Sequence, residues 1–468
     1  MVVRNDEPDK HADAATPAVQ SPRRRKTTLQ PMSLVHPRAA GIDVHSDMHV
    51  VCVPADLDPE PVRTFGANTI DLHAIADWLQ QRGVVTVAME STGIYWIPLF
   101  ELLESRGLEV LLVEPGQLSH CGARPKTDVL DAQWIQRLHS YGLLRGSFRP
   151  PESVLALRGY WRQRQTQVRD AARHVQHIQK ALEQMNVKLT VAVSDITGLT
   201  GMSIIAAILA GERDPRVLAK LRDPRCHRTE EEIARALEGT WRAEHLFALE
   251  QAYELYNFYQ RQITVCDVRL QAELATMADR AEGKSESRKR RKRSRKSGHV
   301  RFDARGPLFH ALGVDLTAID GIDVGTTLVI LAEIGGDVSR FPTEKHFASW
   351  LGLSPPQHTS NGTNKRRGRR KSHNRVAGAL RMAAQSVGST KTPLGQFYRR
   401  IKSRVGGLGA TKATAHKMAV LVYRLLKYGQ EYVRKSMSEY EEKMRASQFA
   451  SLKRKAAALG FELSPLPT

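Results

Sequence analysis

Apolar and polar positions follow two successive patterns in the first third of the chain. From residue 38 the apolar positions come in short runs typical of strands, and helical runs then alternate with further extended ones. The predicted strands span residues 40–45, 49–54, 62–67, 84–89 and 108–113, and the predicted helices span residues 70–81, 94–106 and 128–140. The pattern therefore predicts an α/β domain.

Three strands followed by alternating helix and strand is the order of an RNase H-like sheet. The first and fourth strands are neighbours in such a sheet. Asp43 lies on the first predicted strand and Glu90 falls at the carboxyl end of the fourth, so we expect these carboxylates to face one another. Asp128 and Asp131 begin the next predicted helix, and their spacing of three places both on one helix face.

The middle of the chain has the three-and-four spacing of a coiled-coil seam, in two stretches separated by Pro215 and Pro224. Two such helices predict either an antiparallel pair or an arm for oligomerisation. Gln260 and Asp267 interrupt the second stretch, and they either fix its register or the number of partners, or mark where the helix leaves the seam. The apolar seam positions are Val168, Ala171, Val175, Ile178, Leu182, Met185 and Leu189, then Leu246, Leu249, Tyr253, Tyr256, Ile263, Leu270, Leu274 and Met277.

A short glycine-containing segment occurs twice, at residues 196–202 and 319–325, each time ahead of an apolar run. A glycine turn between short helices, as in a helix-hairpin-helix, exposes backbone N–H groups that can hold a phosphate without reading a base. The same turn is also an ordinary helix connection. Two copies in a basic chain favour contact with a nucleic-acid backbone, with Gly321 and Gly325 as the candidate residues.

Net charge narrows the choice of partner. The chain has 70 Lys and Arg residues against 49 Asp and Glu, a net charge of +21 and a pI near 10.0, which favours nucleic acid. A membrane partner is not expected, because there is no apolar run of about 18 residues and no signal or lipidation motif. The four cysteines form no CxxC pair and predict neither disulfides nor zinc.

Two segments have compositions that oppose packing. Residues 1–37 are polar and include a basic run at 23–26, and we expect a disordered basic arm. Residues 288–296 are almost entirely Arg and Lys, which predicts a flexible polybasic linker at 284–310. This linker either grips nucleic acid electrostatically or is a solvated spacer.

The four acidic residues Asp43, Glu90, Asp128 and Asp131 are informative because the rest of the chain is strongly basic. Oxygen ligands are those that hard divalent cations prefer, so the set predicts one or two Mg²⁺ ions acting on a phosphate backbone. Any one of these residues alone would be better explained as a helix cap or a surface ion pair.

A second candidate site lies in the last third of the chain. Ser360 stands in a Ser-Asn-Gly turn, directly before a dense basic run. A hydroxyl facing many cations is placed to attack a phosphodiester, but a turn that only binds phosphate would look the same. The basic residues are Lys365, Arg366, Arg367, Arg369, Arg370, Lys371 and Arg375.

Together these motifs resemble the DEDD transposases of bacterial insertion sequences, the family described as bridge-RNA-guided recombinases. The resemblance rests on GIDVH at 41–45, MESTGIYW at 89–96, KTDVLDA at 126–132, the turn at 319–325 and ASWLGL at 348–353 leading to the serine and the basic run. It covers residues 38–150 and 315–430. One departure is Ser360-Asn361-Gly362, where many relatives have Ser-Gly-Gly, and Thr359 is a neighbour of similar chemistry.

The resemblance implies an RNase H-like (RuvC-like) domain at 38–150, a helical coiled-coil region at 151–283, a mostly helical transposase domain at 311–445 and a tail at 446–468. It implies that Asp43, Glu90, Asp128 and Asp131 bind Mg²⁺ and that Ser360 is the nucleophile. The implied partners are donor and target DNA, a guide (bridge) RNA and further copies of the chain, as a dimer or tetramer with composite sites. The implied location is the prokaryotic cytoplasm, in association with the nucleoid.

Three functions follow from these observations. The first is a transposase that cleaves and exchanges strands through a covalent phosphoserine with the help of Mg²⁺. The second is a RuvC-like, structure-specific nuclease in which water attacks under the same metals and Ser360 only binds phosphate. The third is a nucleic-acid binder without enzymatic activity, for which Asp43→Ala would change no measurable property.

Overall fold

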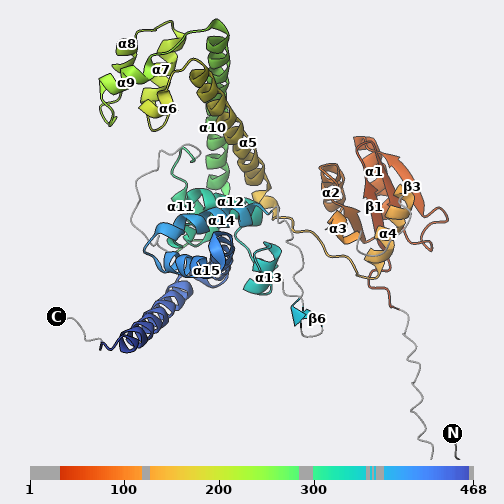
Figure 1. The fold of residues 1–468 in the computed structure, drawn as a ribbon. Coiled ribbons are helices and arrows are strands. Elements are labelled where there is room, and N and C mark those ends of the chain that lie inside the picture. Colours follow the sequence, from red (N-terminus) through yellow and green to blue (C-terminus); the bar gives the residue numbers. More distant parts are fainter. Residues whose placement is uncertain are drawn as a thin grey trace, which may run out of the picture. The chain divides into compact units, whose positions relative to one another are not determined.

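The computed structural model describes residues 32–118, 127–283, 299–354, 359–360, 363–364 and 374–462. For residues 359–360, 363–364 and most of 430–448 it describes the backbone alone. The chain divides into two compact units, Met1–Phe148 and Arg149–Thr468, which we describe separately (Figure 1). Most of the expected basic arm and the polybasic run at 288–296 lie outside the described residues.

The first unit is a five-stranded sheet with helices on both faces. Its strand order is β3-β2-β1-β4-β5, with β1, β2 and β3 antiparallel and with β1, β4 and β5 parallel. Its elements are β1 (Ala39–Val44), β2 (Met48–Cys52), β3 (Val62–Gly66), α1 (Thr69–Gln81), β4 (Thr86–Glu90), α2 (Trp96–Ser105), β5 (Glu109–Val113), α3 (Pro115–Leu118) and α4 (Asp128–Ser140).

This topology confirms the mixed sheet predicted from the apolar pattern. The described ends of the predicted strands and helices differ from the expected ones by at most two residues, and α4 has the predicted bounds. The predicted neighbours β1 and β4 are hydrogen-bonded in parallel. The short helix α3 was not predicted, because four residues are too few to show a helical period.

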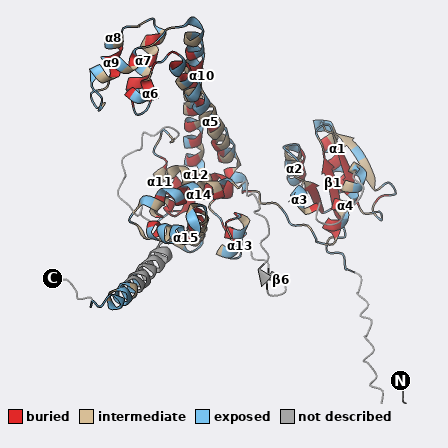
Figure 2. Cartoon of the chain, viewed as in Figure 1, coloured by how far each residue is buried: buried red, intermediate tan, exposed pale blue. Residues whose placement is uncertain are grey.

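Alternation along the strands assigns the two faces of the sheet. Ile42 and Val44 of β1 and Met89 of β4 belong to a core that also contains α1 and α2. Ala88 of β4 packs instead with α4. Because successive strand residues point to opposite faces, residues 41, 43, 88 and 90 lie on the face that α4 covers. Strands β1, β2 and β4 are almost entirely buried, whereas β3 at the edge of the sheet is not (Figure 2).

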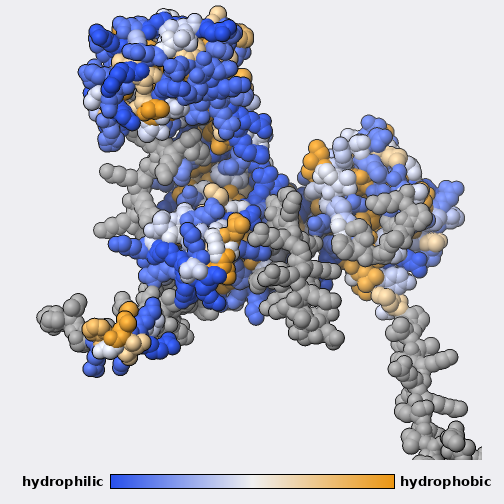
Figure 3. All heavy atoms as spheres, viewed as in Figure 1, coloured by the Kyte–Doolittle hydropathy of each residue, from blue (hydrophilic) through white to orange (hydrophobic). Residues whose placement is uncertain are grey.

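The second unit is built on two long helices, α5 (Leu155–Gln184) and α10 (Ala243–Thr276), which pack along one another (Figure 1). Four short helices lie between them in sequence and share one core with their ends. These four helices and the adjoining ends of α5 and α10 form a helical tip, whose visible surface is mostly hydrophilic (Figure 3). The four are α6 (Leu189–Ala192), α7 (Leu199–Leu209), α8 (Pro215–Ala219) and α9 (Glu230–Leu237).

The two long helices run antiparallel. Arg164 near the start of α5 contacts Asp267 near the end of α10, and at the opposite end Thr240 donates its backbone N–H to the carbonyl of Met185, over 2.8 Å. The alternative of an antiparallel pair is therefore realised within one chain. Helix α5 ends at Gln184, so Met185 and Leu189 lie beyond it, although both are buried in the core at the tip.

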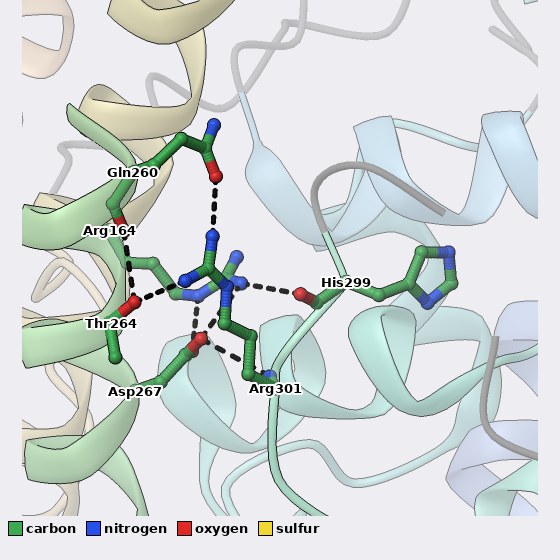
Figure 4. A network of polar contacts seen from close by, with 6 residues as sticks. All are labelled: Arg164, Gln260, Thr264, Asp267, His299 and Arg301. Atoms are coloured by element: carbon green, nitrogen blue, oxygen red, sulfur yellow. Dashed lines mark hydrogen bonds and ion pairs between the residues drawn. The ribbon is translucent and has the colours of Figure 1, made fainter. Parts of the chain in front are cut away.

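Asp267, one of the two polar residues that interrupt the apolar seam, makes a buried contact with the facing helix, and its role in setting the register stays a prediction. Its carboxylate accepts a hydrogen bond from Arg164 Nε at 2.6 Å, and both side chains are almost fully buried. Arg164 also donates to the His299 carbonyl at 2.8 Å, and the Arg301 backbone N–H donates to Asp267 at 3.2 Å. Arg301 in turn donates to Thr264 and Gln260 (Figure 4). The network therefore anchors residues 299–301 onto both helices.

The rest of the second unit is mostly helical. An aromatic cluster of Phe341, Phe347, Trp350 and Tyr423, of which all but Trp350 are buried, joins α13 to α15. The helices are η1 (Glu152–Val154), α11 (Arg305–Leu312), η2 (Leu316–Ala318), α12 (Val324–Ile334), α13 (Glu344–Trp350), α14 (Arg375–Ser386), η3 (Val387–Ser389) and α15 (Pro393–Ala458), and the strands are β6 (Thr359–Ser360) and β7 (Thr363–Asn364). Helix α15 is broken at Gly406 and Gly429.

Candidate metal centre and transposase motifs

Asp43 lies at the centre of the candidate metal site. It is 5% exposed, on the face of β1 that α4 covers. β1 pairs with β4 up to Ile42 opposite Met89, so the same register, continued by one residue, brings Asp43 level with Glu90. Directly paired residues of neighbouring strands point to the same face. Asp43 and Glu90 therefore share a face of the sheet, as the sequence predicted.

Gly41 allows α4 to lie against β1. A Cβ atom at this position would stand 2.2 Å from the backbone nitrogen of Gln136 and 2.5 Å from the carbonyl oxygen of Ala132. No residue other than glycine leaves room for the helix backbone this close to the strand. The approach carries the first turn of α4, with Asp128 and Asp131, toward the strand position of Asp43.

The start of α4 is well defined. Thr127 is its N-cap, and the Thr127 side chain accepts a hydrogen bond from the backbone N–H of Leu130 at 3.3 Å. Asp128 and Asp131 lie in the first turn, where negative charge is favoured by the helix dipole. Both side chains are partly exposed.

His45 completes the cluster, and the sequence patterns did not predict it as a site residue. Its Nε2 lies 3.2 Å from Asp43 Oδ2 and 3.5 Å from Asp128 Oδ1. One ligand atom from each of Asp43, His45 and Asp128 lies within 4.8 Å of the others. The signal that could have found it is the spacing of two between Asp43 and His45, which places both side chains on one side of an extended segment.

The electrostatics of the site suit a cation. Burial raises the pKa of Asp43; His45 opposes this rise, whereas the negative charges of Asp131 and Asp128 add to it. Carboxylates that repel one another in a buried position gain stability when a divalent cation neutralises them. The carboxylate and imidazole donors are therefore compatible with a divalent metal, with Asp43, Asp128 and His45 offering the converging ligand atoms.

The serine segment is described through its backbone. β6 and β7 pair antiparallel, with Ser360 opposite Thr363, and Asn361 and Gly362 between them lie outside the described residues. The preceding ASWLGL motif supplies core residues, because Ala348, Leu351 and Leu353 are all buried. The predicted nucleic-acid residues Lys365, Arg366, Arg367, Arg369, Arg370 and Lys371 lie outside the described residues.

Arg375 and the two turn glycines are described. Arg375 is the first residue of α14, behind the N-cap Asn374. Gly321 has a φ of +84° and faces Val387, so its contacts explain it as a packing glycine. Gly325 lies in the first turn of α12, which Asp323 caps. Contact between this turn and nucleic acid stays a prediction.

Within the described part of the chain, no helix is both long and apolar enough to cross a membrane.

Models of known protein families match both the segment with the acidic residues and the segment with Ser360. A DEDD transposase model of the IS110 type matches residues 40–187, which include Asp43, Glu90, Asp128 and Asp131. A model of the transposase IS116/IS110/IS902 family matches residues 315–399, which include Ser360 and Arg375. No curated protein matches the chain. Two transposase domains in this order show that the chain is an enzyme, a DNA transposase belonging to the DEDD family of insertion-sequence transposases.

Proposed function

We propose that this transposase cleaves and exchanges DNA strands through a covalent phosphoserine at Ser360, assisted by Mg²⁺ at the acidic cluster. The observation that carries the proposal is the convergence of Asp43, Asp128 and His45 within 4.8 Å, inside a domain of the DEDD family. Mg²⁺ bound there would polarise the scissile phosphodiester and stabilise the attacking and leaving oxygens. Asp43, Glu90, Asp128 and Asp131 would hold it, with His45 as a further donor beside Asp43 and Asp128.

The covalent step balances without an external energy source. Ser360 Oγ attacks phosphorus, the Oγ–P bond forms, and the P–O bond to the departing deoxyribose breaks. The serine gives up its proton and the departing oxygen takes one. Reversal with the hydroxyl of a new strand rebuilds the phosphodiester and frees the serine. The basic run from Lys365 to Lys371 would support the charge that develops at phosphorus.

We further propose that a structured RNA guides the choice of DNA and that the chain acts as a homo-oligomer. Support comes from the family resemblance and from the net charge of +21, which is suited to binding backbones while base pairing selects the sequence.

A second candidate is a metal-dependent nuclease in which water attacks. It is favoured by the gathering of Asp43, His45 and Asp128 within one compact unit, which does not contain Ser360. In that mechanism the serine binds phosphate and free DNA ends are the product.

The test is to incubate the full chain, its co-purified RNA and labelled element-junction DNA with Mg²⁺ and to look on a denaturing gel for label that migrates with protein. We expect an adduct in wild type that is lost in Ser360→Ala and in Asp43→Ala. Cleaved DNA without an adduct, unchanged by Ser360→Ala, would establish the nuclease instead. Unchanged binding and no cleavage in any variant would leave a nucleic-acid binder.

A further inference from the structure

Three arginines surround one buried carboxylate where the long helix α5 meets α12 and α14. Glu333, next to the last residue of α12, is 8% exposed in its side chain. Arg162 of α5 donates to both of its oxygens, at 2.9 and 2.7 Å. Arg158 lies 3.1 Å from Oε2 and Arg375 of α14 lies 3.7 Å from Oε1. The three arginines come from two helices that are far apart in the sequence.

The cluster carries more positive charge than Glu333 neutralises. Within the described part of the chain, all three guanidinium groups contact the same carboxylate, that of Glu333. Burial lowers the pKa of Arg158, and the positive charges of Arg162 and Arg375 lower it further against the effect of Glu333. Burial raises the pKa of Glu333, but the Arg162 hydrogen bonds and the surrounding arginines outweigh this and the pKa is lowered. The site therefore holds about two uncompensated positive charges.

These charges are accessible to a ligand. The side chains of Arg162 and Arg375 are 40% and 48% exposed, and that of Arg158 is 23% exposed. Arg162 is fixed by two hydrogen bonds, whereas the half-exposed contact of Arg375 at 3.7 Å adds little to stability. Arginine offers several donors in a planar fork, so groups held in this way are pre-organised for the oxygens of a phosphate.

We propose that Arg158, Arg162 and Arg375, held by Glu333, form a binding site for one phosphodiester of a nucleic-acid backbone. The site lies outside the acidic cluster and the serine segment. It combines Arg158 and Arg162, near the start of α5, with Arg375 in the first turn of α14. It rests on the proposed function only in that the ligand is nucleic acid. DNA and RNA present the same phosphodiester, and the experiment separates the two sources.

The test measures binding of the full chain, without Mg²⁺, to a labelled DNA duplex and to a labelled RNA hairpin between about 50 and 200 mM salt. Arg375→Gln removes one exposed cation that contributes little to folding. We expect its affinity at about 0.1 M salt to fall roughly fivefold to tenfold and the salt slope to fall by about one unit. Arg158→Gln should show the same loss, and Arg375→Lys should restore the slope because it keeps the charge.

Arg173→Gln is the matched control, since it removes the same charge from an exposed position on α5, where Arg173 contacts Asp170 at 3.4 Å. A loss of affinity for only the DNA duplex or only the RNA hairpin identifies the ligand. A loss of affinity for both means that the site binds either nucleic acid. If Arg375→Gln and Arg158→Gln change binding no more than Arg173→Gln on both nucleic acids, the site does not exist. Because the assay requires neither metal nor Ser360, its outcome is independent of the covalent chemistry.

Discussion

Replacing Gly41 with alanine tests how the candidate metal centre is assembled. The added Cβ would lie 2.2 Å from the Gln136 nitrogen, which is 1.2 Å short of the 3.4 Å at which ordinary contact begins. It would also lie 2.5 Å from the Ala132 carbonyl oxygen. Both atoms belong to the backbone, so no rotamer change relieves the overlap and α4 must move away from β1. Asp128 and Asp131 move with the helix.

A displacement of α4 by about 1 Å is expected to change both the free energy of unfolding and the catalytic rate. Overpacking of this kind costs about 1–3 kcal/mol of unfolding free energy. Misplacing catalytic groups by about 1 Å reduces the rate about 100-fold. We therefore expect Gly41→Ala to unfold at a lower temperature and to lose most of the stabilisation that a divalent cation gives to the wild type.

The assay is thermal unfolding of the full chain with increasing Mg²⁺ or Mn²⁺, together with calorimetric titration of the metal. Gly116→Ala is the matched control, because a Cβ at Gly116 would meet nothing within 4 Å. It should retain the wild-type metal response. If Gly41→Ala retains both the wild-type unfolding temperature and the wild-type metal affinity, the close approach of α4 does not position the site.

Two further predictions concern buried charges. Asp267→Ala leaves Arg164 buried without its carboxylate and should lower the free energy of unfolding, measured with denaturant, by about 3–5 kcal/mol. The control Asp170→Ala, at a partly exposed ion pair, should lower it by less than about 1 kcal/mol. Equal effects of the two substitutions would refute a role of Asp267 in setting the register. Burial lowers the pKa of His139 to about 4. Because the unfolded state binds this proton first, stability should fall by about 2 kcal/mol from pH 7 to pH 5, and His139→Gln should remove that part of the pH dependence; an unchanged profile would contradict it.

The sheet could be predicted because its signals are local. Alternation over five or six residues defines each strand, and the order of strands and helices is enough to make β1 and β4 neighbours. That order predicts that Asp43 and Glu90 lie on neighbouring strands, and the β1–β4 register then places both on one face of the sheet. The start of α4 is equally clear from the sequence, since Thr127 is a strong N-cap and two acids follow in the first turn.

The remaining features depend on contacts between distant parts of the chain. His45 becomes a site residue only because α4 brings Asp128 within 3.5 Å of it. The role of Asp267 depends on Arg164, which lies opposite it although it is 103 positions away in the sequence. Arg162 and Glu333 are separated by 171 positions, and no pattern along the chain joins them. Composition predicts a basic protein but not where its charges are organised.

Covalent catalysis by Ser360 is tested most directly by finding the atom that carries the DNA. Wild-type protein is reacted with junction DNA and Mg²⁺, digested with protease and nuclease, and examined by mass spectrometry for a peptide that carries a nucleotide. We expect a phosphodiester link on Ser360 and not on Thr359, with the linked peptide missing in Asp43→Ala. A link on Thr359, or free DNA ends with no linked peptide, would contradict it.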